Sequence, residues 1–207
     1  MPRSFDAPPS IQDVQPKRFI PYPEDAGAAP DAATRSAPAA APPRPTLAFM
    51  LRHPAHWLGL GFGSGLSPKA PGTVGTAWGW LAFLVLELWL TPLGMGLVIG
   101  FSLLLGWWAC TVTARHMGVA DPGSIVWDEI VAIWIVLWLA MPMGFWGQLA
   151  AFALFRYFDA AKPGPVAWAD RLFKGFGWRG GWGILFDDLV AAGCTLLVLA
   201  LWRHLFG

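Results

Sequence analysis

The chain is poor in charged residues and in cysteine. Only 13% of its 207 residues are charged, whereas an ordinary soluble domain has about 25%. The net charge is +1, which gives no case for a nucleic-acid partner, because binding phosphate backbones needs a clustered basic face. The two cysteines, Cys110 and Cys194, both lie in apolar segments, which argues against a disulfide framework or a paired metal motif.

The composition is instead typical of an integral membrane protein. Hydrophobic residues make up 56% of the chain, and the mean hydropathy is +0.50. Many of the 14 tryptophans stand near the ends of apolar runs, which suits the preference of indole rings for the membrane–water interface. We therefore expect a polytopic membrane protein.

Two parts of the chain differ sharply in composition. Residues 1–46 hold 11 of the 19 prolines, with many alanines and no apolar periodicity, so we predict a disordered tail. Residues 47–207 contain all of the long apolar runs. We predict that they form a single helical membrane domain.

The apolar runs predict an all-α fold of about five helices. A short amphipathic helix is expected over residues 47–60, followed by a loop rich in glycine and proline over 61–73. The runs 74–90 and 95–112 predict one helical hairpin. The run 130–155, split at 141–144, predicts a second hairpin whose arms are shorter than the roughly 20 residues of a full span. The last helix is expected over 189–202.

Five crossings would place every motif-bearing segment on one face of the membrane. That face would carry residues 61–73, 113–129 and 156–187, while 91–94 and 141–144 would lie on the other. It would also hold most of the cations, namely Arg52, Lys69, Arg115, Arg156, Lys162, Arg171, Lys174 and Arg179. Because lysine and arginine are in excess in cytoplasmic loops, we predict that this face is cytoplasmic.

Pairs of carboxylates stand at two borders between polar and apolar sequence. Asp128-Glu129 precedes the run 130–155, and Asp187-Asp188 precedes the last run. A carboxylate at the edge of a low-dielectric region needs a cation, a protein base or a proton. Anchoring of helices at the membrane surface is the alternative explanation. The same predicted face carries seven carboxylates: Asp121, Asp128, Glu129, Asp159, Asp170, Asp187 and Asp188.

This set of side chains indicates a metal site that handles phosphate. Oxygen ligands without paired histidines or cysteines favour Mg²⁺ over Zn²⁺. The neighbouring lysines and arginines suit a phosphate group, whose negative charge must be neutralised during transfer. Asp159 is three residues from both Arg156 and Lys162, so a helix there would place the three side chains on neighbouring turns.

At these residues the sequence resembles the phosphatidylglycerophosphatase A family. Four motifs carry the resemblance in the order of the family: GFGSGLSPKAPGTVGT at 61–76, DPGSIVWDE at 121–129, RYFDAAKPGPVAWADR at 156–171 and GILFDD at 183–188. The resemblance covers about residues 57–200. It implies a helical, Mg²⁺-dependent enzyme of the bacterial inner membrane, with its active site on the cytoplasmic face. The expected reaction removes the terminal phosphate of phosphatidylglycerol phosphate and yields phosphatidylglycerol, with no obligatory protein partner.

The resemblance also implies roles for individual residues. The expected metal ligands are Asp128, Glu129, Asp187 and Asp188, and the expected catalytic residues are Asp128, Glu129, Asp159, Lys162 and Arg156. The expected substrate-binding residues are Lys69, Ser67, Thr73, Arg171 and Asp170. Two features depart from the family: Gly164 stands where many members have tryptophan, and the link between Arg171 and Gly183 is several residues longer than usual.

Several alternatives stay open at this stage. The attacking group is either water or a carboxylate of Asp159 or Asp128. Neither cysteine precedes the glycine-rich arginine loop of cysteine phosphatases, and the Asp-x-Asp motif of another phosphatase class is absent. The aspartate spacing that characterises CDP-alcohol-type phosphotransferases is absent from this chain, which argues against that class. A small transporter or ion-binding protein is favoured only by Glu87, which lies within an apolar run.

Overall fold

The computed structural model describes residues 44–206, and the predicted disordered tail lies outside this range except for its last three residues. Within the described range every regular element is a helix, which confirms the prediction of an all-α fold for this part of the chain. The elements are α1 (Leu47–Met50), α2 (Pro54–Gly59), the 3₁₀ helix η2 (Gly61–Leu66), α3 (Pro71–Glu87), α4 (Pro92–Met117), α5 (Trp127–Ala140), α6 (Phe145–Ala161), α7 (Pro165–Leu172) and α8 (Gly177–Phe206).

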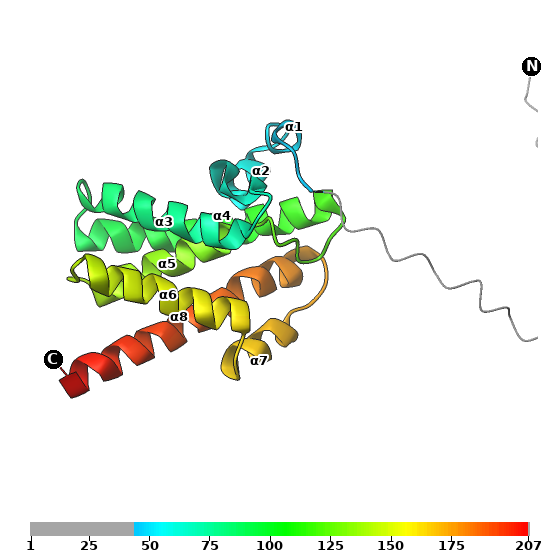
Figure 1. Ribbon diagram of the computed structural model, residues 1–207. Helices are drawn as coiled ribbons and strands as arrows, with labels where there is room; N and C mark the ends of the chain where they lie inside the picture. Colours follow the sequence, from blue (N-terminus) through cyan, green and yellow to red (C-terminus); the bar gives the residue numbers. More distant parts are fainter. Residues whose placement is uncertain (1–43, 207) are drawn as a thin grey trace, which may run out of the picture. The chain divides into compact units, whose positions relative to one another are not determined.

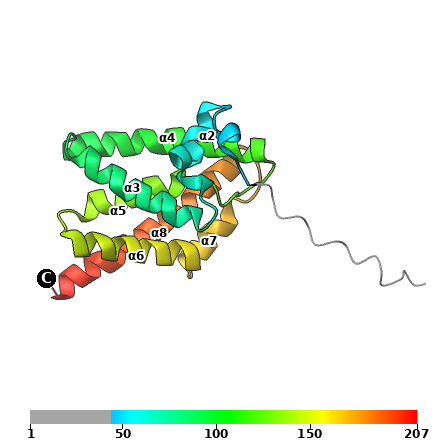
Figure 2. The same ribbon diagram turned by 45° about the horizontal axis from the view of Figure 1, so that its top comes forward.

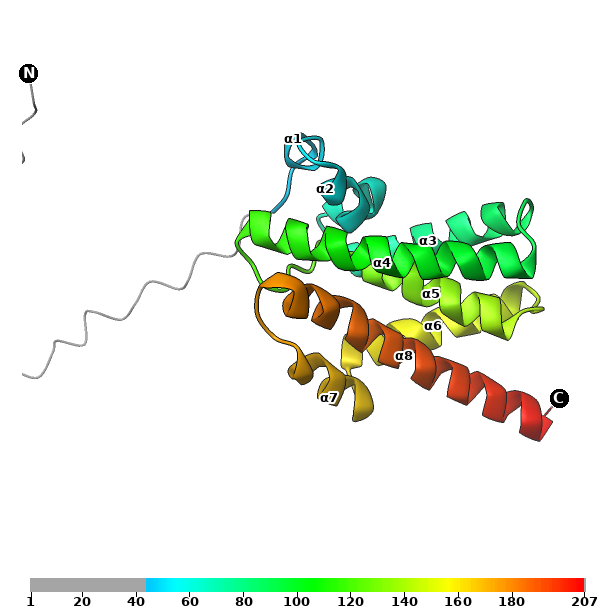
Figure 3. The ribbon, with the colours of Figure 1, turned by 180° about the vertical axis from the view of Figure 1, so that it is seen from behind.

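The five long helices alternate in direction (Figure 1). The first residues of α3, α5 and α8 and the last residues of α4 and α6 lie at the same end of the bundle, as the views from the front and from behind both show (Figures 1 and 3). We call this the loop end: it carries residues 61–70, 118–126 and 162–176, together with α1, α2 and α7. The motif-bearing segments therefore gather at one end, and the turns 88–91 and 141–144 lie at the other.

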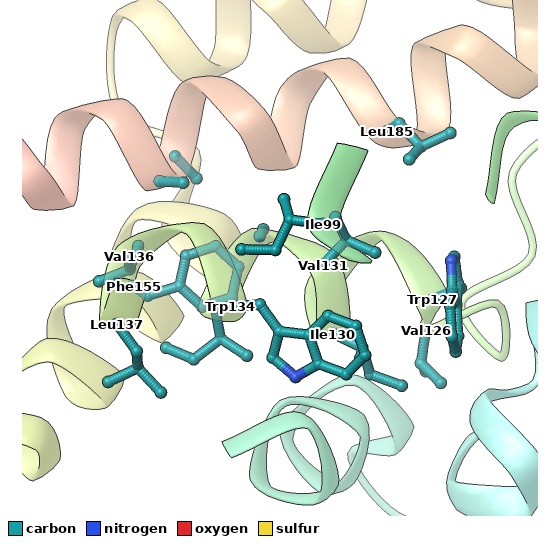
Figure 4. Packing of buried hydrophobic residues seen from close by; sticks show 14 of the residues in the cluster. Ile99, Val126, Trp127, Ile130, Val131, Trp134, Val136, Leu137, Phe155 and Leu185 are labelled. Atoms are coloured by element: carbon teal, nitrogen blue, oxygen red, sulfur yellow. The ribbon is translucent and has the colours of Figure 1, made fainter. Parts of the chain in front are cut away.

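Helix α5 is the centre of the bundle, with α3 and α8 packed against it (Figures 2 and 4). Nearly all of its residues between Ile130 and Leu137 are buried, which explains why its sequence is apolar all round. Three indole N–H groups fix it to its neighbours: Trp127 Nε1 donates to Ser102 O at 3.0 Å, Trp134 Nε1 to Gly79 O at 2.7 Å and Trp138 Nε1 to Pro92 O at 2.9 Å. Its position and direction determine where Asp128 and Glu129 lie.

Several predicted helix boundaries were wrong, each for a local reason. Helix α3 begins at Pro71 rather than residue 74, because proline has the backbone angle of the first helical position and needs no N–H partner there. Helix α4 continues past residue 112 to Met117, where Gly118 ends it in the left-handed conformation. The single helix expected over 47–60 is two helices, since Pro54 starts α2 with His53 as its N-cap.

The last helix differs most from the prediction. Helix α8 begins at Gly177, so Asp187 and Asp188 lie well inside it and do not precede it. Gly180 and Gly181 in its first turns are buried, and a Cβ atom on Gly181 would overlap Thr111 of α4. Close packing against α4 therefore stabilises helical turns whose glycines have a low intrinsic helix propensity.

Among residues 44–206, two helices are long and apolar enough to cross a membrane, judged by length and composition. They are α4, with a mean hydropathy of 1.8, and α8, with 2.1. Helices α3 and α6 have 17 residues each and α5 has 14, fewer than the roughly 20 of a full span. Large apolar side chains are exposed along the outside of the bundle, among them Leu81, Leu97, Leu104, Leu197 and Leu201, so its outer surface suits an apolar surrounding. Both cysteines are free, with Cys110 buried and Cys194 half-buried.

Candidate active site

The glycine-rich segment before α3 packs against the link before α5. Val126 N donates to Gly59 O at 2.9 Å. A Cβ atom on Gly65 would overlap the carbonyl oxygen of Ser124, so only glycine allows the two backbones to approach this closely. This contact places the first turn of α3 beside the first turn of α5.

Glu129 lies directly against that first turn of α3. A Cβ atom on Gly72 would overlap Glu129 Oε1, and one on Gly75 would lie 3.2 Å from Glu129 Oε2. Ala70, the N-cap residue of α3, is left-handed (φ 46°) and caps no backbone N–H with its side chain. The first N–H groups of α3 therefore lie near the carboxylate without a side-chain cap.

Arg156 of α6 joins three helices at this point. Its Nη1 atom donates to Glu129 Oε1 of α5 at 3.0 Å and to Thr76 Oγ1 of α3 at 3.3 Å. The same guanidinium forms an ion pair with Asp159, one turn further along α6, as the predicted helical spacing requires. The side chains of Arg156, Glu129 and Asp159 are 18%, 12% and 12% exposed, so little water screens these charges.

Lys162 forms a second group of charges at the C-terminal end of α6. Its backbone is left-handed (φ 43°), and its Nζ atom donates to Asp187 Oδ2 of α8 at 2.6 Å and also to Asp170 of α7. Lys174 approaches the other oxygen of Asp170 at 2.7 Å. Lys162 thereby connects α6, α7 and α8, just as Arg156 connects α3, α5 and α6.

The pKa values of this second group favour the charged forms. Burial lowers the pKa of Lys162, but hydrogen bonds to Asp170 and Asp187 outweigh it, and the pKa lies above its usual value. Burial raises the pKa of Asp170, but hydrogen bonds from Lys162 and Lys174 outweigh it, and the pKa lies below its usual value. The stability that Lys162 contributes is present below its unfolded pKa of about 10.4 and is lost at higher pH; that of Asp170 is present above about 3.9 and is lost at lower pH. The pair is ionised throughout the neutral range.

Several buried carboxylate oxygens in these groups, or on residues next to them in sequence, have no partner. Asp128 Oδ1, Glu129 Oε2 and Asp188 Oδ2 have no hydrogen-bond donor in the described part of the chain, and Arg156 Nε has no acceptor there. Unpartnered buried charges of one sign are costly, so this position calls for a cation.

The chemistry of these residues fits a hard divalent cation. Within residues 44–206, no group of three or more acidic, histidine or cysteine side chains is already close enough together to hold a metal ion. The available donors are all oxygens, which Mg²⁺ prefers. Three of those oxygens, on Asp128, Glu129 and Asp188, are the unpartnered ones. Asp187 differs, because Lys162 already donates to it.

The predicted substrate-binding residues are less tightly grouped than the predicted ligands. Lys69, Thr73 and Arg171 are exposed at the loop end, and neither Lys69 nor Arg171 forms an ion pair with a described residue. Ser67 Oγ donates to Lys69 O at 2.8 Å, so it stabilises the turn before α3. Asp170 is held between two lysines.

Sequence reasoning missed two residues of these charge groups. Thr76 is fully buried and receives a hydrogen bond from Arg156 while donating to Gly72 O at 2.9 Å. Its presence in the first motif was the available signal. Lys174 was left out of the predicted site, yet it pairs with Asp170, and the spacing of four residues could have indicated this contact, even though Lys174 lies just beyond the end of α7 at Leu172.

Comparison with known proteins decides the family. The family model described as phosphatidylglycerophosphatase A matches residues 57–203, which include all four motifs, both charge groups and the unpartnered carboxylates. The chain belongs to the phosphatidylglycerophosphatase A family. This confirms the family and the enzyme class that were predicted, in preference to the phosphotransferase and transporter alternatives.

Curated relatives agree with this membership. A phosphatidylglycerophosphatase A of Escherichia coli (strain K12) is 43% identical over 147 residues, covering 68% of this chain and 78% of the relative. That of Haemophilus influenzae is 42% identical over 159 residues, covering 75% and 92%. A relative from Bacteroides thetaiotaomicron, 38% identical over 161 residues (72% and 94%), bears the provisional name phosphatidylinositol-3-phosphatase. No solved structure matches this chain.

Proposed function

We propose that this member of the phosphatidylglycerophosphatase A family hydrolyses the terminal phosphate of phosphatidylglycerol phosphate and so supplies phosphatidylglycerol. Membership of the family and the names of two of its relatives support the reaction. The structural observation that carries it is the set of buried, unpartnered carboxylate oxygens on Asp128, Glu129 and Asp188 beside the fixed cation Arg156. Such a site can handle a phosphate together with a divalent cation.

We propose that Mg²⁺ is held by Asp128, Glu129, Asp187 and Asp188. The unpartnered oxygens of three of these residues support the assignment. For Asp187 to take part, it would share its carboxylate with Lys162. When bound, Mg²⁺ supplies charge neutralisation and Lewis acidity toward the phosphate oxygens.

The remaining residues of the site bind and orient the phosphate. Arg156 Nε is a buried N–H donor without an acceptor, and a peripheral phosphate oxygen can accept from it. Lys162 brings a second fixed positive charge, which stabilises negative charge that develops in the transition state. Lys69 and Arg171 at the exposed rim, with the uncapped start of α3, attract the phosphate toward the site.

Glu129 and Asp159 act first of all on Arg156. Both accept from its Nη1 atom, so they fix the plane of the guanidinium and the direction of Nε. Asp159, 12% exposed, is also placed to accept a proton from an attacking water at the edge of the cluster.

We also propose that the five long helices cross the bacterial inner membrane with the loop end in the cytoplasm. Trp89, Trp146 and Trp202 are exposed at the opposite end of the bundle, as expected for rings at the second interface. Helices of 17 residues span only about 25 Å, somewhat less than the roughly 30 Å hydrocarbon core. The loop end carries most of the lysines and arginines, which favours the cytoplasmic orientation.

Chelation tests the metal requirement directly. Purified protein in detergent micelles is expected to release phosphate from phosphatidylglycerol phosphate with Mg²⁺, and excess EDTA should abolish the release. Activity should return when Mg²⁺ is added back in excess. Full activity of the metal-free protein would disprove the metal assignment, and no release from folded protein under any of these conditions would disprove the reaction.

Replacing Lys162 should be costly but less so than replacing a carboxylate of the cluster. Lys162→Ala is expected to lower kcat/KM for phosphatidylglycerol phosphate by about tenfold, since Lys162 holds the proposed ligand Asp187 without being a ligand itself. Lys174→Ala is the matched control, because Lys174 is 55% exposed and exposed ion pairs contribute little. A loss for Lys162→Ala as large as that for Asp128→Asn would contradict this subsidiary role.

A further inference from the structure

Three histidines gather at the loop end, and the proposed function uses none of them. His53 is the N-cap of α2, His56 lies in its first turn, and His116 lies in the last turn of α4. The ring centroid of His56 is 5.4 Å from that of His53 and 5.1 Å from that of His116. His56 is 3% exposed, and both of its ring nitrogens have partners. Nδ1 lies 2.8 Å from Phe49 O of α1, and Nε2 lies 2.8 Å from Nδ1 of His116, so His56 joins α1, α2 and α4.

The partners of His56 determine where its proton lies. A carbonyl oxygen only accepts, so Nδ1 of His56 carries the hydrogen and donates to Phe49 O, and Nε2 is the bare nitrogen of a neutral ring. Nδ1 of His116 then carries a hydrogen and donates to Nε2 of His56. His116 can donate in its neutral or its charged form, whereas His56 cannot gain a proton on Nε2 without losing this bond.

The surroundings of His56 favour the neutral ring. Burial lowers the pKa of His56 below its usual value, the hydrogen bond to Phe49 O offsets this only in part, and the neighbouring bases His116, His53 and Arg52 lower the pKa further. Because the folded pKa lies below the unfolded value of about 6.5, the stability that neutral His56 contributes is complete above about pH 6.5 and decreases as the pH falls toward the folded pKa.

The other helices packed on α2 add few ionisable groups. Helices α1 and η2 have none. Those of α4 and α5 are Cys110, Arg115, His116, Asp128 and Glu129.

Helix α2 connects His56 to the start of α5. It lies against α4 at the loop end (Figure 3), where Thr113 Oγ1 also donates to Ala55 O at 3.1 Å. One turn after His56, Gly59 O accepts from Val126 N at 2.9 Å. Val126 is the N-cap residue of α5 and stands two residues before the first carboxylate of the site. The position of α2 on α4 therefore determines where α5 begins.

We propose that His56, with His116 as its donor, is a positioning residue for the active site. It fixes α2 on α4 and, through Gly59, the first turn of α5 with its two carboxylates. This assignment rests on the proposed function and extends it to residues that touch neither the phosphate nor the metal. Because the contact needs a neutral His56, acid loosens α2 and with it the start of α5.

Replacing His116 tests the contact without disturbing the core, because His116 is exposed. His116→Ala removes the donor to His56 and is expected to lower kcat for phosphatidylglycerol phosphate about tenfold at neutral pH and saturating Mg²⁺, since misplaced catalytic groups slow the reaction. KM should change little. His116→Asn presents an amide N–H in place of Nδ1 and should restore most of the wild-type rate. His204→Ala is the matched control, because His204 is exposed in the last turn of α8 and should change neither value.

Hydrogen exchange follows the same contact without using activity. The backbone N–H of Val126, which is bonded to Gly59 O, should exchange about tenfold faster in His116→Ala than in the wild type, and at the wild-type rate in His116→Asn. Lowering the pH from about 7.5 to about 5.5 should raise this exchange in the wild type, after correction for the intrinsic rate. It should not do so in His116→Asn, whose amide can turn its oxygen toward a protonated His56.

The possible outcomes separate the two proposals. Wild-type behaviour of His116→Ala in either kcat or the exchange of Val126 would overturn the positioning role. An equal loss in His116→Asn and His116→Ala would overturn it too, because the effect would then not depend on the hydrogen bond. No phosphate release by the folded wild type would overturn the proposed function, while the exchange of Val126 would still test the contact.

Discussion

Asp128→Asn should lower the rate of phosphate release from phosphatidylglycerol phosphate by about a hundredfold or more without destabilising the protein. Asp128 lies in the first turn of α5, with Oδ1 buried and without a donor. An amide of the same shape removes one negative charge that would hold a divalent cation. It also relieves repulsion from Glu129 and Asp188, so the melting temperature should stay the same or rise.

Two measurements test this prediction together. Mg²⁺ should raise the melting temperature of the wild type, because a ligand that binds only the folded state stabilises it, and this rise should be smaller in Asp128→Asn. Glu87→Gln is the matched control: it makes the same chemical change at an exposed position far from the loop end and should keep both activity and the Mg²⁺ effect. Near-normal turnover by purified Asp128→Asn would show that the metal assignment is wrong.

Arg156→Met should cost both stability and activity. The substitution keeps an apolar stem but leaves Glu129 and Asp159 as largely buried carboxylates without their shared partner. Removal of one partner from a buried ion pair costs about 3 kcal/mol or more. We expect a markedly lower melting temperature in detergent, and phosphate release reduced by about a hundredfold or more, because the Nε donor is also lost.

Further variants separate the two effects of Arg156. Arg156→Lys keeps a positive charge near both carboxylates but lacks the planar fork, so it should recover much of the stability and little of the activity. Adding Glu129→Gln to Arg156→Met should also recover stability, but no activity. Arg115→Met, at an exposed site on α4, should change neither property. Unchanged thermal stability of Arg156→Met would contradict the role of this residue in joining three helices.

The helices of this fold could be predicted wherever apolar pattern alone determines them. The run after Glu129 is apolar on every face because α5 is buried on every face, and its existence was clear from sequence. The start of α8 was not clear from sequence. Gly177, Gly180, Gly181 and Gly183 suggest a loop by composition, and only contact with α4 and neighbouring segments accounts for a helix there.

The residues of the site could be predicted from sequence, but the contacts between them could not. The position of Asp128 and Glu129 beside an apolar run already called for a counter-charge. Arg156 pairs with Glu129, and both contact α3, at Thr76 and Gly72. These contacts depend on how three helices pack. No local pattern encodes a contact between residues 80 positions apart in sequence.

The left-handed backbone of Lys162 has a consequence for how this protein can vary. A residue with a β-carbon at φ 43° costs roughly 1–2 kcal/mol relative to an ordinary helical conformation, and glycine avoids most of that cost. Against that gain, Lys162→Gly would leave Asp187, 10% exposed, and Asp170 without the cation that they share, and loss of one partner from a largely buried ion pair costs more than this strain. The ion pairs therefore outweigh the backbone cost, and a library screened in turn for thermal tolerance and for growth that depends on the product lipid should retain lysine at this position under both screens.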